Sequence, residues 1–327
     1  MGKISAETLR QRISQYTNSQ NPISIRDMYS DNPKQSSIQE NINNNYDGFF
    51  WERKSGERQL KIRQVSDASW ERKHKPQQLR IIDNLTVAKI SYGYYNEKPI
   101  EAVRLREEEI FVTDETFKAI FVDIPPKQFV ISWILDKILD KSIQYIKNTK
   151  NQQILASNIY GSKYEFESVI DLLRSEYAKR TCLALIHNFL KKNKKFDKIE
   201  DAIIRFMKFS ASKNGKPLNK AAGISEEQIE HLRPIFLCIM QYFDIVFRDI
   251  FFGGKNFSTH QPPIESKDIR AIFEKQEPDK DGVLYYSTYC NILAKMESTD
   301  KTSNGNITTL IDNFSEKIIS EANNLDP

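Results

Sequence analysis

The sequence predicts an α+β protein that is predominantly α-helical, with a small β-hairpin or sheet near residues 48–64. Three observations support this class. Apolar residues recur at helical spacing over long stretches, and the 327 residues include only 11 glycines. Alternating segments are confined to the region before residue 67. Hydrophobic residues make up 39% of the chain, which is enough for a buried core.

The elements before the expected sheet are short helices joined by a polar loop. Residues 6–16 carry apolar side chains at helical spacing. The segment TNSQNPIS, residues 17–24, is rich in small polar residues and contains a proline, so we expect a loop there. A second helix is expected from Pro33, because proline is favoured in the first turn of a helix.

The expected β element is a hairpin. GFFWERK, residues 48–54, has the composition of a strand that follows a turn, and RQLKIRQVS, residues 58–66, is a second alternating segment. Ser55-Gly56 would form the turn between them. From about Lys75 the apolar spacing becomes helical, at Leu79, Ile82, Leu85, Ala88 and Ile90.

The rest of the chain is expected to be helical. Amphipathic segments separated by polar or glycine-containing stretches span residues 126–148, 168–190, 199–209, 225–250 and 307–323. We therefore predict two modules. Residues 1–125 would carry the hairpin and the sequence motifs, and residues 126–327 would form a helical C-terminal module.

Cysteine usage and hydropathy indicate the cytoplasm. Cys182, Cys238 and Cys290 lie far apart in apolar helical contexts and do not form a metal-binding spacing. The N-terminal segment lacks the apolar region of a signal peptide. The most apolar stretch, IFLCIMQYFDIVF, is interrupted by Gln241 and Asp244 and is too short to span a bilayer. We expect a cytoplasmic protein with no membrane partner.

Glu52 and Lys54 have the Glu-x-Lys spacing with which many nucleases hold Mg²⁺ and stabilise a hydroxide or a phosphate. Such a site needs a second carboxylate, for which Asp27, Asp31 and Asp47 are the candidates. None of these three is expected on a strand, so a hairpin with a charged solvent face is the favoured interpretation. No cofactor is expected, and Mg²⁺ only if the nuclease alternative holds.

Positive charge is concentrated around the same segment. The whole chain has a net charge of +4, whereas residues 51–80 hold nine Lys or Arg against four Asp or Glu. Aromatic residues interleave with these cations and could either stack on bases or form the core face of the hairpin. The expected phosphate contacts are Arg53, Lys54, Arg58, Lys61, Arg63, Arg72, Lys73 and Lys75.

Residues 277–289, EPDKDGVLYYSTY, resemble a calcium-binding loop at Asp279, Asp281 and Gly282. The twelfth position of that loop is Thr288, where a bidentate glutamate is needed. An ordinary turn is therefore the favoured interpretation.

Several motifs in the first hundred residues occur in a characteristic order. They are TNSQN at residues 17–21, the Asp27 to Asp31 segment, Gln35, the strand FFWERK, and NEKPIEA at residues 96–102. In this order they resemble the second half of the abortive infection phage-resistance (AIPR) family. The resemblance covers residues 4–125 and implies anti-phage defence in a bacterium, through host shutdown or attack on nucleic acid.

The resemblance also implies a partner. Members of that family are usually much longer and carry an upstream region suspected of nuclease character. We expect this chain to act with another protein chain that carries the missing N-terminal half, or as a homo-oligomer, with DNA or RNA as a further partner. In the motif loop, Asn18, Gln20 and Asn21 can hold local backbone or contact base edges.

Three functions remain open at this point. The leading hypothesis is a component of a phage-defence system that binds nucleic acid or a partner chain and is not itself catalytic. The first alternative is a Mg²⁺-dependent nuclease in which Glu52 and Lys54 act with Asp27 or Asp31. The second is a purely structural assembly subunit.

Overall fold

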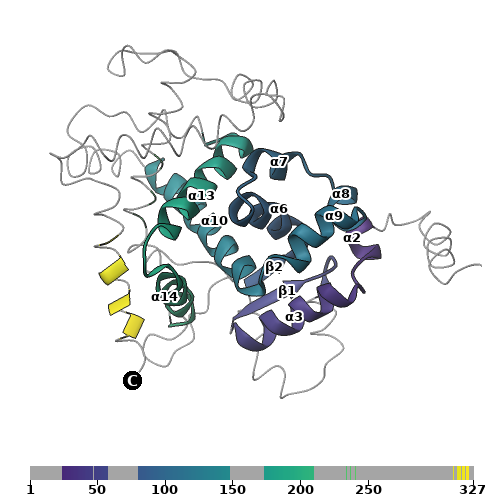
Figure 1. The fold of residues 1–327 in the computed structure, drawn as a ribbon, viewed down its shortest axis with the longest axis horizontal. Helices are drawn as coiled ribbons and strands as arrows, with labels where there is room; N and C mark the ends of the chain where they lie inside the picture. Colours follow the sequence, from purple (N-terminus) through teal and green to yellow (C-terminus); the bar gives the residue numbers. More distant parts are fainter. Residues whose placement is uncertain are drawn as a thin grey trace, which may run out of the picture.

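The computed structural model describes four stretches of the chain, residues 24–46, 48–57, 80–147 and 173–209. It also describes single positions in the C-terminal part: residues 233, 236, 240, 312, 315–317, 319, 320, 322 and 323. Over these residues helices predominate, and two short strands form one sheet (Figure 1). The predicted class, a mainly helical α+β protein, is confirmed.

The named elements follow the chain in the order of Figure 1. They are α2 (Ile25–Met28), α3 (Pro33–Asn45), β1 (Phe49–Glu52), β2 (Arg80–Asp83), α6 (Asn84–Tyr95), α7 (Pro99–Arg104), α8 (Glu107–Phe111), α9 (Asp114–Phe117), the π-helix η2 (Lys118–Val122), α10 (Pro126–Ile146), α13 (Glu176–Lys191) and α14 (Phe196–Phe209). As predicted, α3 begins at Pro33. Its N-cap is Asn32, whose side chain accepts a hydrogen bond from the Lys34 backbone N–H at 2.9 Å.

The sheet is parallel and is not a hairpin. β1 pairs with β2 in a register that sets Phe49 beside Arg80 and Glu52 beside Asp83. The pairing of β1 with β2 was not part of the predicted hairpin. Its expected second strand, residues 58–66, lies outside the described residues.

The segment that forms β2 was also predicted wrongly, because its apolar residues were assigned to a continuous helix. In the structure, α6 begins only at Asn84. Asp83 is its N-cap, and the Asp83 carboxylate accepts a hydrogen bond from the Thr86 backbone N–H at 2.8 Å. Ile81 and Ile82 precede this cap and fit a short strand equally well.

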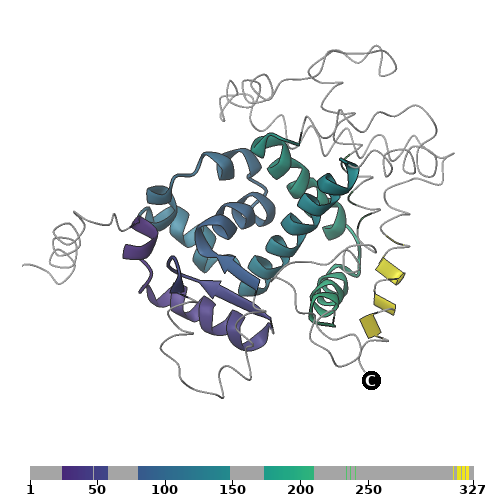
Figure 2. The ribbon, with the colours of Figure 1, turned by 180° about the vertical axis from the view of Figure 1, so that it is seen from behind.

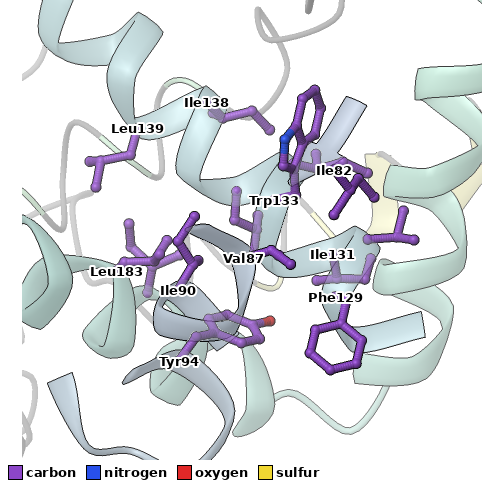
Figure 3. Packing of buried hydrophobic residues seen from close by; sticks show 14 of the residues in the cluster. Ile82, Val87, Ile90, Tyr94, Phe129, Ile131, Trp133, Ile138, Leu139 and Leu183 are labelled. Atoms are coloured by element: carbon purple, nitrogen blue, oxygen red, sulfur yellow. The ribbon is translucent and has the colours of Figure 1, made fainter. Parts of the chain in front are cut away.

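Helix α6 lies at the centre of the core. It packs against α7, α10 and α13, which surround it in Figures 1 and 2. Figure 3 shows Val87, Ile90 and Tyr94 of α6 among apolar side chains of α10 and Leu183 of α13. Buried residues occur on all sides of α6, as expected of a helix that is enclosed by others.

Helices from both sides of position 125 thus contribute to one cluster of buried side chains. The division into modules at that position stays a prediction. Among the described residues, no helix combines the length and the apolar run that a bilayer crossing requires. Cys182 of α13 is a buried free thiol, and burial raises its pKa.

The close contact of α6 with α7 depends on Gly93. A Cβ atom at this position would lie 3.2 Å from the Ala102 Cβ and 3.3 Å from the Pro99 Cα. We expect Gly93→Ala to lower the free energy of unfolding by about 1–2 kcal/mol, because the overlap outweighs the better helix propensity of alanine. Urea unfolding measures this difference.

A double-mutant cycle serves as the control for Gly93. Ala102→Gly removes one of the two atoms that the new Cβ would meet. The double variant Gly93→Ala/Ala102→Gly should therefore be more stable than the sum of the two single effects predicts. Strict additivity of the two substitutions would refute the packing argument.

Candidate functional site

The carboxyl ends of β1 and β2 carry two acidic side chains held by one buried arginine. The parallel register sets Glu52 beside Asp83. The side chain of Arg26, from α2, is 8% exposed and forms ion pairs with the Asp83 carboxylate and with Glu52 Oε2, the latter at 3.7 Å. Its guanidinium also donates to the backbone carbonyls of Glu52 at 3.0 Å and of Arg53 at 3.2 Å. The cation therefore joins both strand ends.

Helix α2 is placed for this role by contacts on both sides. The Ser24 hydroxyl caps the helix by accepting from the Asp27 backbone N–H at 3.2 Å. The Arg26 backbone N–H donates to the Glu107 carboxylate of α8. The Asp27 carboxylate accepts from the Ser55 backbone N–H at 3.1 Å, which ties α2 to the turn after β1.

A second ion pair closes that turn. Arg53 Nη2 lies 2.8 Å from Glu57 Oε1, and the Arg53 guanidinium also donates to the Ser36 hydroxyl at 2.8 Å and to the Ser30 carbonyl at 3.1 Å. Burial raises the pKa of the Glu57 carboxyl, but hydrogen bonds from Arg53 and from Gln39 lower it, and the net direction is downward. Glu57 therefore stays ionised beside its arginine.

Buried amides link the two ion pairs to the core. The Gln35 side-chain oxygen accepts from the indole N–H of Trp51 at 3.2 Å and from the Asn84 amide at 3.3 Å. The Asn84 amide also donates to the Arg53 carbonyl at 3.1 Å. Gln39 donates to the Trp51 carbonyl at 2.8 Å and to Glu57 at 3.0 Å. These contacts hold the end of β1 in one orientation.

We call the charged residues of this region the strand-end cluster. Its members are Arg26, Glu52, Arg53, Glu57 and Asp83. Arg26 is shared by the carboxylates of Glu52 and Asp83, and Arg53 pairs with Glu57, so the cluster is suited to fixing the strand ends. Within the described stretches, no three His, Cys, Asp or Glu side chains are grouped so that they could hold a metal ion.

The structure places the predicted nuclease residues in different surroundings. Glu52 is 13% exposed and is paired with Arg26, whereas Lys54 is partly exposed in the turn that follows β1. Asp27 binds the backbone of that turn. Asp31 is exposed just before α3. Asp47 lies outside the described residues.

The aromatic residues of β1 belong to the core. Phe49, Phe50 and Trp51 are at most 1% exposed. The Phe49 ring packs edge-on against Trp133 of α10 at 5.7 Å between centroids, and the Trp51 ring lies 5.0 Å from that of Phe129. In this structure these three rings cannot stack on bases, and the interpretation of them as core residues is confirmed.

Two arginines of the basic stretch are likewise internal. Arg53 is bound by Glu57, and Arg80 is buried, with its guanidinium 5.2 Å from the centre of the Phe49 ring and donating to the Met207 carbonyl at 3.0 Å. Burial lowers the pKa of Arg80. Of the other proposed binding residues, Lys54 lies within the described stretches. The remaining ones lie outside them: Asn18, Gln20, Asn21, Arg58, Lys61, Arg63, Arg72, Lys73 and Lys75. The calcium-like segment, residues 277–289, lies outside them too.

Sequence reasoning missed Arg26, Asp83 and Glu57 as parts of this site. A signal existed for Asp83, because an Asp before an apolar helical run marks an N-cap and so a boundary at the end of β2. No local signal identifies Arg26, since arginine is usually exposed and its partners come from distant segments.

The fold and the cluster define a class of protein: a mainly helical α+β protein whose parallel strand pair is closed by buried ion pairs. A comparison with family models then supplies the relationship. The model described as AIPR protein matches residues 3–231, and the chain belongs to this family. The match extends well beyond residues 4–125, over which the order of motifs indicated it, and includes α10, α13 and α14.

Membership assigns the chain to anti-phage defence of the abortive infection type. The searches of curated proteins and of solved structures found no match. The motif residues Asp27, Gln35, Glu52 and Arg53 are now seen to meet at the end of β1.

Proposed function

We propose that this chain is a nucleic-acid-binding subunit of a bacterial phage-defence system and is not itself catalytic. In this proposal it works in the cytoplasm, and a partner chain or a second copy completes the active assembly. Basic residues that follow β1 contact the phosphate backbone. No cofactor takes part.

The state of Glu52 is the observation that supports the non-catalytic part of the proposal. A nuclease of the Glu-x-Lys type needs this carboxylate as a metal ligand. Here the Glu52 side chain is paired with Arg26, which also holds Asp83 and two backbone carbonyls. A metal ion would have to displace a buried and fully engaged guanidinium.

The charge distribution supports the choice of nucleic acid as the partner. Residues 51–80 hold nine Lys or Arg against four Asp or Glu, a net charge of +5 that exceeds the +4 of the whole chain. Because Phe49, Phe50 and Trp51 are buried, binding would rest on charge and would be largely independent of base sequence. Lys54 is partly exposed in the turn that follows β1, just before the remaining basic residues.

A binding assay with a labelled DNA duplex and a labelled RNA strand tests the proposal. We expect binding at low salt that weakens steeply between about 50 and 200 mM salt, because phosphate contacts release counterions. With Mg²⁺ present, both substrates should stay intact.

Two results would contradict this expectation in different ways. Cleavage that requires Mg²⁺ and is abolished by Lys54→Ala would establish the nuclease alternative. A chain that retains neither nucleic acid at low salt would be a structural assembly subunit.

A further inference from the structure

Five lysines lie between the last residue of α13 and the first turn of α14. They are Lys191, Lys192, Lys194, Lys195 and Lys198, and all are exposed. Asp197 is the one acidic residue among positions 191–198, so the eight residues carry a net charge of +4. We call this segment the lysine turn. It is separate in sequence from residues 51–80, where the positive charge was first noted.

The helix dipole favours Lys191 and Lys192 at the carboxyl end of α13, but local helix stability does not account for the lysines at the start of α14. Lys194 and Lys195 directly precede α14, and Lys198 lies in its first turn. The helix dipole disfavours cations at the amino end of a helix, so the placement works against α14 itself. Among the described residues, neither Lys194 nor Lys198 has an ion-pair partner. The positive charges of Lys194 and Lys198 are therefore exposed, and no carboxylate of the described residues pairs with them.

The lysine turn already attracts carboxylates from two distant parts of the chain. Lys191 Nζ lies 3.6 Å from Glu97, which follows α6, and Lys195 pairs with Glu316. The Asn193 amide donates to Asp312 at 2.7 Å. Figures 1 and 2 show the described positions near the C-terminus, coloured yellow, beside α14.

These contacts lie in solvent and can be exchanged. The side chains of Lys195 and Glu316 are 44% and 69% exposed, and ion pairs of this kind contribute little stability. A backbone phosphate could replace such a carboxylate at small cost, because it carries the same charge on two acceptor oxygens.

From this arrangement we infer that the lysine turn binds the phosphate backbone of a nucleic acid. An acidic peptide is the less suitable ligand, because peptide interfaces add large apolar anchors. The one large apolar side chain of the turn, Phe196, is partly buried against the core. The inference rests on the proposed function as a nucleic-acid-binding subunit and adds a second contact surface to it.

The test compares two variants that each lose three positive charges. In the turn variant, Lys192, Lys194 and Lys198 are replaced by glutamine. In the control variant, Lys34, Lys118 and Lys147 are replaced by glutamine, and these three are also exposed. Fluorescence anisotropy with a labelled mixed-sequence DNA duplex measures the affinity of both variants and of the full wild-type chain over a range of salt concentrations.

We expect the turn variant to bind about tenfold more weakly than the control at moderate salt. The slope of log K against log salt should fall in magnitude by about two to three, since each duplex phosphate contact contributes about 0.9. Thermal melting of the two variants should agree, because all six positions lie on the surface.

Three outcomes would overturn the inference, and they can be told apart. If the wild-type chain binds no duplex even at low salt, the proposed function fails together with the inference. If the wild-type chain binds but the turn variant matches the control, only the lysine turn is excluded. If polyglutamate displaces the duplex as efficiently as unlabelled duplex does at equal charge, the ligand is an acidic peptide.

Discussion

Replacement of Arg26 by methionine is expected to lower the free energy of unfolding by about 3–5 kcal/mol. Methionine keeps an apolar stem but removes the guanidinium, which leaves the carboxylates of Glu52 and Asp83 at adjacent strand ends without their cation. The backbone carbonyls of Glu52 and Arg53 also lose a donor. Urea unfolding followed by circular dichroism measures the change.

Arg106→Met is the matched control for this prediction. Arg106 is 75% exposed and pairs with Glu109 in solvent, so its loss should change stability by less than about 0.5 kcal/mol. Adding Asp83→Asn to Arg26→Met should recover part of the loss, because one of the two facing charges is then removed. If Arg26→Met and Arg106→Met were equally mild, Arg26 would not hold the strand ends together.

His187 carries the second large effect, because α13 buries its ring against α6. Its ring centroid lies 4.0 Å from that of Tyr94 and 5.7 Å from that of Phe196. The pKa of His187 is lowered from 6.5 to about 4, mainly by burial and also by the charge of Lys191, while a backbone hydrogen bond with Tyr94 acts in the opposite direction. The folded protein therefore keeps the imidazole neutral at pH values where a free histidine takes up a proton.

We expect His187 to reduce stability by about 3 kcal/mol as the pH falls from 6.5 to 4. In this interval the unfolded chain binds a proton at His187 that the folded chain does not, so the free energy of unfolding falls with pH. Above this interval the ring is neutral in both states, and below it the ring is protonated in both. In His187→Phe this part of the pH dependence should be absent.

Urea unfolding of both chains at several pH values through this interval measures the effect. Phenylalanine retains the ring contacts with Tyr94 and Phe196 but cannot titrate. The pKa of Glu57 is lowered in the folded protein, so its protonation in acid also lowers the free energy of unfolding. This contribution is the same in both chains. The difference between the two curves therefore reports His187 alone. Parallel curves would show that its ring is protonated as easily in the folded state as in the unfolded state.

Elements with local signals could be predicted from the sequence. The helix from Pro33 and the long helix from Pro126 begin where the prolines and the apolar spacing place them. β2 could not be predicted in this way, because Ile81 and Ile82 fit a helix or a strand. Parallel pairing has no local signal at all, since it depends on a partner far along the chain.

The candidate site was predictable only in its individual residues. Gln35 and Glu52 stood out because of their place in the order of motifs, but their partners did not. Glu52 is held at the strand end by its ion pair with Arg26. A buried arginine departs from the usual exposure of that residue type, so this partner was not expected. Lysines of the turn between α13 and α14 were overlooked because the charge count considered only residues 51–80.

From the parallel pairing of β1 and β2 we expect a particular order of folding. Glu52 and Asp83 are 31 positions apart, so no tight turn can bring their strands together, and loop closure slows the pairing. Contacts between α6 and α7 are close in sequence and should form early. We expect the strand-end cluster to assemble last, in chains whose helical core has already formed.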